Sequence, residues 1–573
     1  MTWYEEAVFY HIYPLGLTGA PKQNNYGSPV CRLKELKDWI GHIKNIGCNA
    51  IYIGPLFQSV GHGYETTDYR LLDSRLGENK DLTEFVADCH NEGIKVILDG
   101  VFNHTGRDFF AFLDIKKNRE NSVYKDWYCN VNFYGNTEYN DGFSYENWGG
   151  YNLLVKLNQK NPQVKEYIAD VVRFWVKEFD IDGIRLDAAD VLDFSYMQML
   201  RQVAEEVKPD FWLMGEVIHG DYNKWANEGT LHSVTNYQLH KALYSGHNDH
   251  NYFEIAHTVK RLNDMFKNGN VKLYNFVDNH DVERIYTKLQ NKDHFVPVHI
   301  LLYTLPGIPS LYYGSEFGIE GRKEKGSDDS LRPRLELKEW IKNETYVGLI
   351  TRLGKLRNQY KAFAYGSFEE LCLTNRQYAF VRRWKGQSLY TAVNNDENPA
   401  NLTLPVEKSG KYQGLLSGEI VEAEGERLFV TLPACQGEVW IELGQQEGNP
   451  VLSLTERKPE KNQKDDEEKQ ASDSSVREKE ESKEISDTEE KEETALEGKK
   501  AEEKTAQKTE GTKGGSEWVE IDHSKRYEEM SIEELQAVIY EKMRKNGPVT
   551  ERMKQDIIEN IYHNSLVTWA KSF

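Results

Sequence analysis

The stretch Asn161-Pro-Gln-Val-Lys-Glu-Tyr-Ile-Ala-Asp-Val-Val-Arg-Phe-Trp-Val-Lys-Glu-Phe-Asp-Ile-Asp-Gly-Ile-Arg-Leu-Asp187 contains a predicted helix followed by a predicted strand. Asparagine is a favoured N-cap residue and proline suits the first helical position, so the helix begins after Asn161. Apolar residues then recur at helical spacing, at Val164, Ile168, Val171, Val172, Trp175 and Phe179. The β-rich run Gly183–Leu186 follows and leads directly into the carboxylate of Asp187.

Similar units of a short strand and a helical pattern recur between residue 1 and about residue 360. Eight strands are predicted: Val8–Tyr13, Ala50–Ile53, Val96–Val101, Gly183–Leu186, Phe211–Gly215, Ser233–Tyr237, Leu273–Val277 and Ile308–Tyr312. Strands that alternate with helices form parallel sheets, and eight such units are typical of a closed barrel. The predicted fold class is therefore α/β, a (β/α)8 TIM barrel formed by residues 1–103 and 159–360.

One interval is too long for a single βα unit. The third strand ends near Asp99 and the fourth ends 88 positions later at Asp187, whereas one unit needs roughly 30 residues. The intervening sequence is rich in Asn, Gly, Tyr and Trp and lacks clear periodicity. We therefore expect a loop-rich inserted subdomain over 104–158.

The sequence after the barrel alternates apolar and polar residues, as in Leu389–Val393 and Leu428–Leu432, with turn signals such as Asn394-Asn-Asp396. This pattern predicts an antiparallel β-sandwich over 361–443. Residues 451–513 then hold 14 Lys/Arg and 20 Asp/Glu and no aromatic residue. A segment with so many charged residues cannot bury enough apolar surface to fold. We therefore predict a disordered linker over 444–516. A single long charged helix is the alternative.

The last predicted part, residues 517–573, is helical. Ser531-Ile-Glu-Glu534 is a capping box that opens an amphipathic run, and Asn546-Gly-Pro548 ends that run. The module either is a solvated helix pair or binds a partner that the sequence does not identify.

Overall composition restricts the class of protein. The 573 residues are 39% hydrophobic and 12% aromatic, enough for a large core. The net charge of −21 argues against nucleic-acid and anionic-membrane partners. Six scattered cysteines fit free thiols in a reducing compartment. Since neither a signal peptide nor a long apolar run is found, we expect a cytoplasmic protein.

Acidic residues gather where predicted strands end, the edge at which barrels hold their catalytic groups. The four segments are Asp99-Gly-Val-Phe-Asn103-His104, Gly183-Ile-Arg185-Leu-Asp187, Gly215-Glu216 and Phe276-Val-Asp278-Asn279-His280-Asp281. Taken singly, each acid is equally well a helix cap or half of an ion pair, and Asn279–Asp281 alone also fits a metal site. Together they match retaining glycoside hydrolysis, which needs one carboxylate as nucleophile and one protonated carboxyl as acid.

The four segments resemble, in order, the four signature regions of the α-amylase family of glycoside hydrolases. The resemblance covers roughly residues 3–443 and includes Gly47–Gln58, His62–Tyr69 and Gly307–Glu316. It implies a barrel, an insert after the third strand and a C-terminal sandwich. It also implies an α-glucan substrate.

The resemblance implies a role for each residue at the strand ends. Asp187 would be the nucleophile, Glu216 the general acid and base, and Asp281 the group that stabilises the oxocarbenium-like transition state. Burial beside the other two acids would give Glu216 the raised pKa that an acid needs near neutrality. Substrate contacts would come from Tyr64, His104, Arg185 and His280, and structural support from Asp99, Asn103 and Asn279.

Two further segments are similar to the neopullulanase, cyclomaltodextrinase and maltogenic branch. They are Asn152–Asn158, with its Lys156-Leu157-Asn158, and Gly215-Glu216-Val-Ile-His219. That branch carries an extra N-terminal domain used in dimerisation, whereas this barrel begins almost at residue 3, so we do not expect dimerisation by that route. His62 stands where exo-acting α-glucosidases carry an acid, which argues against strict exo-action.

The resemblance leaves a structural calcium ion open. Calcium-dependent members follow the nucleophile with a Lys-His pair, and Asp190-Val191 stands at the matching positions here. Asn103 and Asp278 could still supply oxygen ligands. We expect no required cofactor, with structural calcium as the alternative.

The predicted function is hydrolysis of α-1,4 links in maltodextrins or cyclodextrins, with retention, through a covalent intermediate on Asp187. A 4-α-glucanotransferase, in which a sugar hydroxyl replaces water, is the first alternative. A catalytically silent glucan-binding protein is the second, and the presence of all three acids argues against it.

Overall fold

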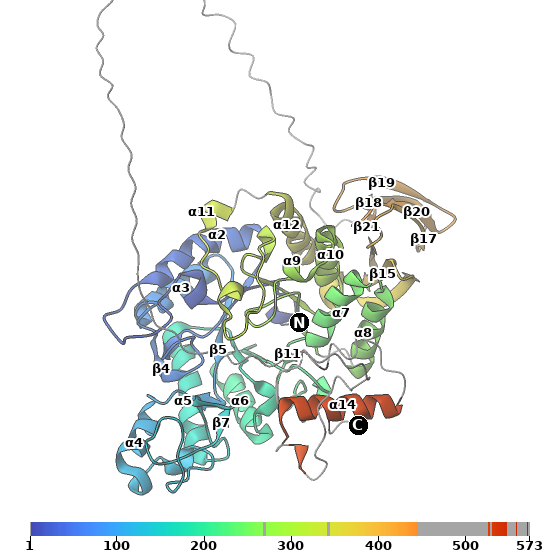
Figure 1. Ribbon diagram of the computed structural model, residues 1–573. Helices are drawn as coiled ribbons and strands as arrows, with labels where there is room; N and C mark the ends of the chain where they lie inside the picture. Colours follow the sequence, from blue (N-terminus) through green and yellow to red (C-terminus); the bar gives the residue numbers. More distant parts are fainter. Residues whose placement is uncertain are drawn as a thin grey trace, which may run out of the picture. The chain divides into compact units, whose positions relative to one another are not determined.

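The computed structural model describes residues 2–266, 271–340, 344–444, 525–527 and 530–546, together with residues 557 and 570. The chain divides into two compact units, Met1–Val451 and Leu452–Phe573, which are described here one after the other. Figure 1 shows the first unit built around a barrel of parallel strands.

The barrel strands are β1 (Phe9–Ile12), β2 (Ala50–Ile53), β5 (Lys95–Gly100), β9 (Gly183–Leu186), β10 (Trp212–Gly215), β11 (Ser233–Val234), β12 (Tyr274–Phe276) and β13 (Ile308–Tyr312). They pair in the order β11-β10-β9-β5-β2-β1-β13-β12, and a parallel bridge between Thr235 and Tyr274 joins the two edges. All eight predicted strands are confirmed. The sixth is shorter than predicted, because the Asn236 side chain accepts a hydrogen bond from the Leu239 N–H (3.1 Å) and so begins a helix there.

The main helices around the barrel are α2 (Lys37–Asn45), α3 (Asn79–Asn91), α5 (Pro162–Phe179), α6 (Phe194–Val207), α7 (Tyr237–Asn248), α8 (Tyr252–Met265), α10 (Phe295–Thr304) and α12 (Glu344–Gln359). Helix α5 begins as predicted, because the Asn161 side chain accepts hydrogen bonds from the N–H groups of Gln163 and Val164. The fifth unit departs from the pattern. Between β10 and β11, where every residue is described, it contains only the 3-10 turn η6 (Tyr222–Lys224).

Large apolar side chains fill the inside of the barrel. The rings of Phe9 and Trp212 stack with centroids 5.1 Å apart, and Tyr274 packs against Phe9 at 5.5 Å. A barrel filled in this way is a packed core rather than a pore. Its polar groups are consequently available at the carboxyl ends of the strands.

The insert leaves the barrel after β5. It holds a three-stranded sheet of β6 (His104–Thr105), β8 (Tyr151–Lys156) and β7 (Asn147–Trp148), the helix α4 (Phe110–Asn118) and long loops. Helix α4 has no counterpart in the prediction. Phe110 and Leu113 are exposed on one side of it while Phe112 and Ile115 are buried on the other, so apolar residues surround the helix and hide its periodicity.

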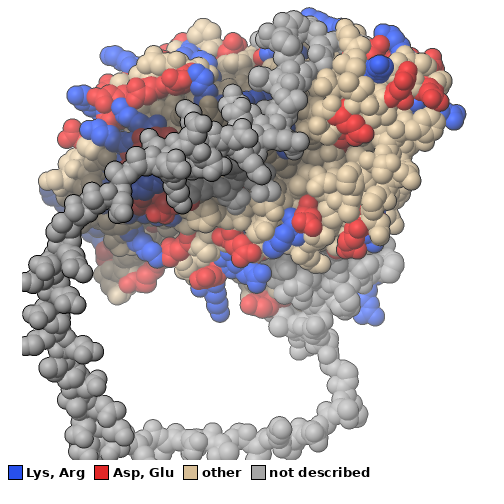
Figure 2. Space-filling model, turned by 90° about the horizontal axis from the view of Figure 1, so that it is seen from above, with Lys and Arg blue, Asp and Glu red and all other residues tan. Residues whose placement is uncertain are grey.

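The C-terminal part of the first unit is antiparallel, as predicted. Its strands are β14 (Ser367–Leu373), β15 (Gln377–Trp384), β16 (Gln387–Asn394), β17 (Ala400–Pro405), β18 (Gly410–Gly414), β19 (Ile420–Glu424), β20 (Arg427–Leu432) and β21 (Gly437–Glu442). They pair in the order β14-β15-β16-β21-β18-β19-β20-β17 around a separate core. In Figure 1 this domain and the insert lie on opposite sides of the barrel. Figure 2 shows charges of both signs interspersed on one face of the molecule.

The second unit contains α14 (Ile532–Asn546). The predicted capping box is present: the Glu534 N–H donates to Ser531 Oγ (3.2 Å) and the Ser531 N–H donates to Glu534 Oε2 (2.7 Å). Leu535, Val538 and Ile539 are buried on one face of the helix. The predicted linker lies outside the described residues, and a binding partner for this module stays a prediction. No helix in the described ranges has the length and apolar character needed to cross a membrane.

Candidate active site

The predicted acids lie at the carboxyl ends of neighbouring barrel strands. Asp99 is the second-last residue of β5, and it lies opposite Arg185 of β9 in the parallel pairing of the two strands. Asp187 directly follows β9, Glu216 directly follows β10, and Asp281 lies beyond β12. Since β9 lies between β5 and β10 in the sheet, the first three carboxylates are brought to one place.

The buried guanidinium of Arg185 joins these three carboxylates. Its Nη1 donates to Asp99 Oδ1 and to Asp187 Oδ1, both at 2.9 Å, and its Nη2 lies 2.8 Å from Glu216 Oε2. Arg185 and Asp187 are two residues apart on β9, so their side chains share one face of the strand. The guanidinium of Arg185 therefore orients all three carboxyl groups and partly neutralises their charge.

Glu216 receives two further hydrogen bonds. Ala188 has a left-handed backbone (φ 46°), and its N–H donates to Glu216 Oε2 at 3.1 Å. The Tyr237 hydroxyl contacts the other oxygen, Oε1, at 3.3 Å. Gly215 lets the strand approach its neighbours, because a Cβ there would lie 2.4 Å from the Leu231 side chain. Two N–H donors hold Oε2 whereas one hydroxyl, that of Tyr237, contacts Oε1, so Oε1 is the oxygen better placed to carry a proton.

Asp281 has a different set of partners. Its Oδ1 accepts from Arg332 Nη2 at 2.9 Å, and its Oδ2 lies 3.1 Å from His280 Nε2. The Tyr64 hydroxyl also contacts His280 Nε2, and its ring stacks on the imidazole with centroids 5.8 Å apart. The loop between β3 (Phe57–Ser59) and β4 (Thr66–Leu72) carries Tyr64 to this side of the site.

These environments push the pKa values of the acids apart. Burial raises the pKa of Glu216, and the charge of Asp281 adds to the rise against the opposing Arg185. Burial also raises the pKa of Asp187, and the neighbouring Glu216 adds to the rise. For Asp281, burial is outweighed by His280 and Arg332, which hold its pKa below the ordinary range. The site thus combines two carboxyl groups whose pKa values are raised with one whose pKa is lowered.

The remaining predicted residues support this arrangement. His104 Nε2 donates to the Tyr64 carbonyl (3.1 Å) and its Nδ1 accepts from Asn103 Nδ2 (3.2 Å). Both ring nitrogens are thereby occupied, and the contact predicted between His104 and the sugar stays a prediction. Asn279 Oδ1 accepts from the Asp281 N–H at 2.8 Å, and its Nδ2 donates to the Tyr237 hydroxyl at 3.2 Å. Since Tyr237 contacts Glu216, Asn279 positions Asp281 directly and Glu216 through Tyr237.

Three residues of the site were not predicted. Tyr52 donates to Asp99 Oδ2 at 2.7 Å, Tyr237 contacts Glu216, and Arg332 binds Asp281. Strand periodicity could have indicated Tyr52, which lies on the buried run Ala50–Ile53. Arg332 lies in a loop after β13, and no sequence pattern around it indicates a place in the site.

Comparisons with known proteins agree with this geometry. Residues 23–345 match the family model described as "Alpha amylase, catalytic domain", and residues 368–440 match "Maltogenic Amylase, C-terminal domain". The chain belongs to the alpha-amylase family. A cyclomaltodextrinase from Thermoanaerobacter pseudethanolicus is 31% identical over 75% of this chain and 76% of its own. Neopullulanase 2 from Thermoactinomyces vulgaris is 30% identical over 76% of this chain and 77% of its own.

Among solved structures, a debranching enzyme from Nostoc punctiforme superposes with a TM-score of 0.67 and 27% identity, over 77% of this chain and 98% of its own. This alpha-amylase-family protein is therefore a glycosidase, and the relatives named above place it among hydrolases of α-glucans.

The residues proposed for calcium do not fit an ion in this structure. Asn103 Oδ1 accepts from Gln159 Nε2 at 3.0 Å, and Gln159 Oε1 accepts from the Asp193 N–H at 2.6 Å. Both oxygens of Asp278 accept from Ser315 Oγ at 2.8 Å. Across the described residues no cluster of three His, Cys, Asp or Glu side chains has a metal-binding arrangement. The buried Gln159 amide joins Asn103, at one end of the insert, to Asp193, the N-cap residue of α6.

We therefore predict that chelation does not destabilise the enzyme. A millimolar excess of EDTA should leave the unfolding temperature and activity unchanged, measured by scanning calorimetry and by reducing-sugar release. Gln159→Ala should lower the unfolding temperature, because it leaves the Asn103 oxygen and the Asp193 N–H without their partner, at a cost of about 1–3 kcal/mol. A drop of several degrees in EDTA, reversed by calcium, would contradict the prediction.

Proposed function

We propose that this enzyme hydrolyses α-1,4 links of maltodextrins or cyclodextrins with retention of anomeric configuration. The observation that carries the proposal is the single guanidinium of Arg185, which holds Asp187 and Glu216 together while Asp281 is kept ionised by Arg332. A double displacement requires an ionised nucleophile beside a protonated acid, and in the proposed mechanism these are Asp187 and Glu216.

In the first step, Asp187 attacks the anomeric carbon and the glycosidic C–O bond breaks. The proton on Glu216 Oε1 passes to the departing oxygen, which leaves as the shortened glucan. Positive charge develops on the sugar ring in the transition state, and the ionised Asp281 stabilises that charge. The product of the step is a glycosyl ester of Asp187.

In the second step, Glu216 acts as a base. It removes a proton from water, whose oxygen bonds to the anomeric carbon as the bond to Asp187 breaks. Two inversions give net retention, and both carboxyl groups return to their starting states. A sugar hydroxyl in place of water would give the transferase alternative with the same three acids.

A product analysis tests the proposal. Wild-type enzyme is incubated with maltotriose, β-cyclodextrin and pullulan in turn, and proton NMR follows the anomeric signals. Hydrolysis predicts products shorter than maltotriose that appear first as the α-anomer. Products longer than maltotriose as the main outcome would favour the transferase, and an initial β-anomer would exclude the double displacement.

We also propose a cytoplasmic location for the enzyme. All six cysteines are free thiols, in keeping with a reducing compartment.

A further inference from the structure

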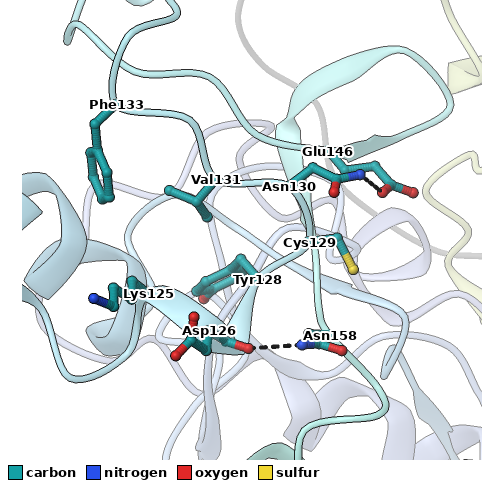
Figure 3. A pocket seen from close by; sticks show the side chains of 9 residues that line it. All are labelled: Lys125, Asp126, Tyr128, Cys129, Asn130, Val131, Phe133, Glu146 and Asn158. Atoms are coloured by element: carbon teal, nitrogen blue, oxygen red, sulfur yellow. Dashed lines mark hydrogen bonds between the residues drawn. The ribbon is translucent and has the colours of Figure 1, made fainter. Parts of the chain in front are cut away.

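The insert carries a second cavity, outside the site described above. Its volume is about 440 Å³, within the range of small-ligand sites. None of the three acids, nor Tyr64, His104, Arg185 or His280, lines it. The lining residues shown in Figure 3 are Lys125, Asp126, Tyr128, Cys129, Asn130, Val131, Phe133, Glu146 and Asn158.

The walls combine apolar surfaces with hydrogen-bonding groups, and the charges of Lys125 and Asp126 are opposite in sign. Phe133, Val131 and Tyr128 supply the apolar part. The charge of Glu146 is compensated, since its Oε1 pairs with Lys156 Nζ at 2.5 Å. A ligand for such walls is neutral, has apolar faces and carries many hydroxyl groups at its edges. A sugar has these properties.

The polar side chains are held in place by contacts that leave acceptors facing the cavity. Asn130 Nδ2 donates to Glu146 Oε2 at 2.8 Å, and Asn158 Nδ2 donates to the backbone carbonyl of Asp126 at 3.0 Å, both drawn in Figure 3. In the described part of the chain, neither the Asp126 carboxylate nor the Asn130 amide oxygen accepts a hydrogen bond. The Asn130 oxygen is therefore preorganised for a hydroxyl donor, and the exposed Asp126 carboxylate can accept from a second one.

Tyr128, in the wall of the cavity, contacts the strand of the insert that carries His104. The hydroxyl of Tyr128 hydrogen-bonds Thr105 Oγ1 at 2.8 Å, and Thr105 is the neighbour of His104 on β6. The backbone of Tyr128 also pairs with that of Leu157, just after β8, in an antiparallel β-bridge. A glucan held here would thus be retained beside the mouth of the barrel.

We propose that this cavity is an accessory site for a short α-glucan, such as two or three units of a maltooligosaccharide. The choice of ligand rests on the proposed function. Phe133 would stack on one sugar face, and Asp126 and Asn130 would accept hydrogen bonds from its hydroxyls.

Maltotriose binding to full-length Asp187→Asn enzyme tests the proposal by isothermal titration calorimetry, because this variant is expected to bind without turnover. Two maltotriose molecules per chain are expected. Asp187→Asn with Phe133→Ala should bind one. Asp187→Asn with Tyr134→Ala is the matched control and should bind two, since Tyr134 is the next residue but is 99% exposed and does not line the cavity.

A second variant guards against misfolding of the first. Asp126→Ala changes an exposed side chain and keeps the backbone carbonyl that holds Asn158, and it should weaken the second site about tenfold or more. One maltotriose per chain in Asp187→Asn, or two in both cavity variants, would overturn the accessory site. Cleavage of maltotriose by wild-type enzyme reports separately on the proposed function, whose failure would appear as no products at all.

Discussion

Asp187→Asn is expected to lower kcat on maltotriose on the order of 10⁴-fold or more, equivalent to about 5.4 kcal/mol in activation free energy. An asparagine side chain has the shape of the carboxylate but forms no stable glycosyl ester, so the first step of the proposed double displacement would be lost. Arg185, which contacts Asp187 Oδ1 at 2.9 Å, would still position the side chain. Initial rates of reducing-sugar release measure the effect.

Asp193→Asn is the matched control, with the same chemical change six residues later. Its side chain caps α6 by accepting from the Ser195 N–H at 2.9 Å, and asparagine caps helices equally well. Activity should be unchanged. Asp187→Asn should also unfold at the same temperature or higher, because it relieves the crowding of buried carboxyl groups around one guanidinium. More than about 1% of wild-type activity in a correctly folded Asp187→Asn protein would refute the assigned nucleophile.

The sequence was sufficient where structure depends on local pattern. The predicted strands Ala50–Ile53, an apolar run, and Gly183–Leu186, which contains Arg185, each follow a helical pattern, and the structure has them at those same residues. Because each of Asp99, Asp187 and Glu216 ends or follows such a strand, the barrel topology alone brings them together. Asn161 and Ser531 were equally readable, since capping depends on residues only a few positions away.

The remaining features depend on contacts between distant segments. Arg332 reaches Asp281 across 51 positions, and Gln159 reaches Asn103 across 56. Neither residue belongs to a periodic pattern, so the sequence offers no reason to single it out. Asn103 is an example: the sequence shows a side chain with an oxygen that could bind a cation, and only the three-dimensional structure shows that Gln159 donates a hydrogen bond to that oxygen. Predictions from strand ends give the acids and their neighbour Arg185, while partners from distant loops, such as Arg332, are found only in the three-dimensional structure.

The buried position of Glu216 sets an expected pH dependence. A raised pKa means that the carboxyl keeps its proton to a higher pH than an exposed glutamic acid, which titrates near about 4.3. The acid form is active in the first step, so kcat/KM should fall as pH rises through the raised pKa. Stopped assays with maltotriose across pH 4 to 9 measure this alkaline limb.

Glu216→Gln should remove that limb and lower kcat/KM for maltotriose about 10²–10⁴-fold. With α-maltosyl fluoride the first step should proceed, since fluoride departs without a proton, but the second step still lacks its base. The expected result is a burst of fluoride equal to the enzyme concentration, with a glycosyl ester on Asp187 visible by mass spectrometry. Glu206→Gln is the control, because Glu206 pairs with Arg173 on the outer helices (3.0 Å) and should leave both substrates unaffected. A steady rate on maltotriose with an intact alkaline limb in Glu216→Gln would assign the acid elsewhere, and equal loss on both substrates would mean that Glu216 positions the sugar rather than supplying the proton.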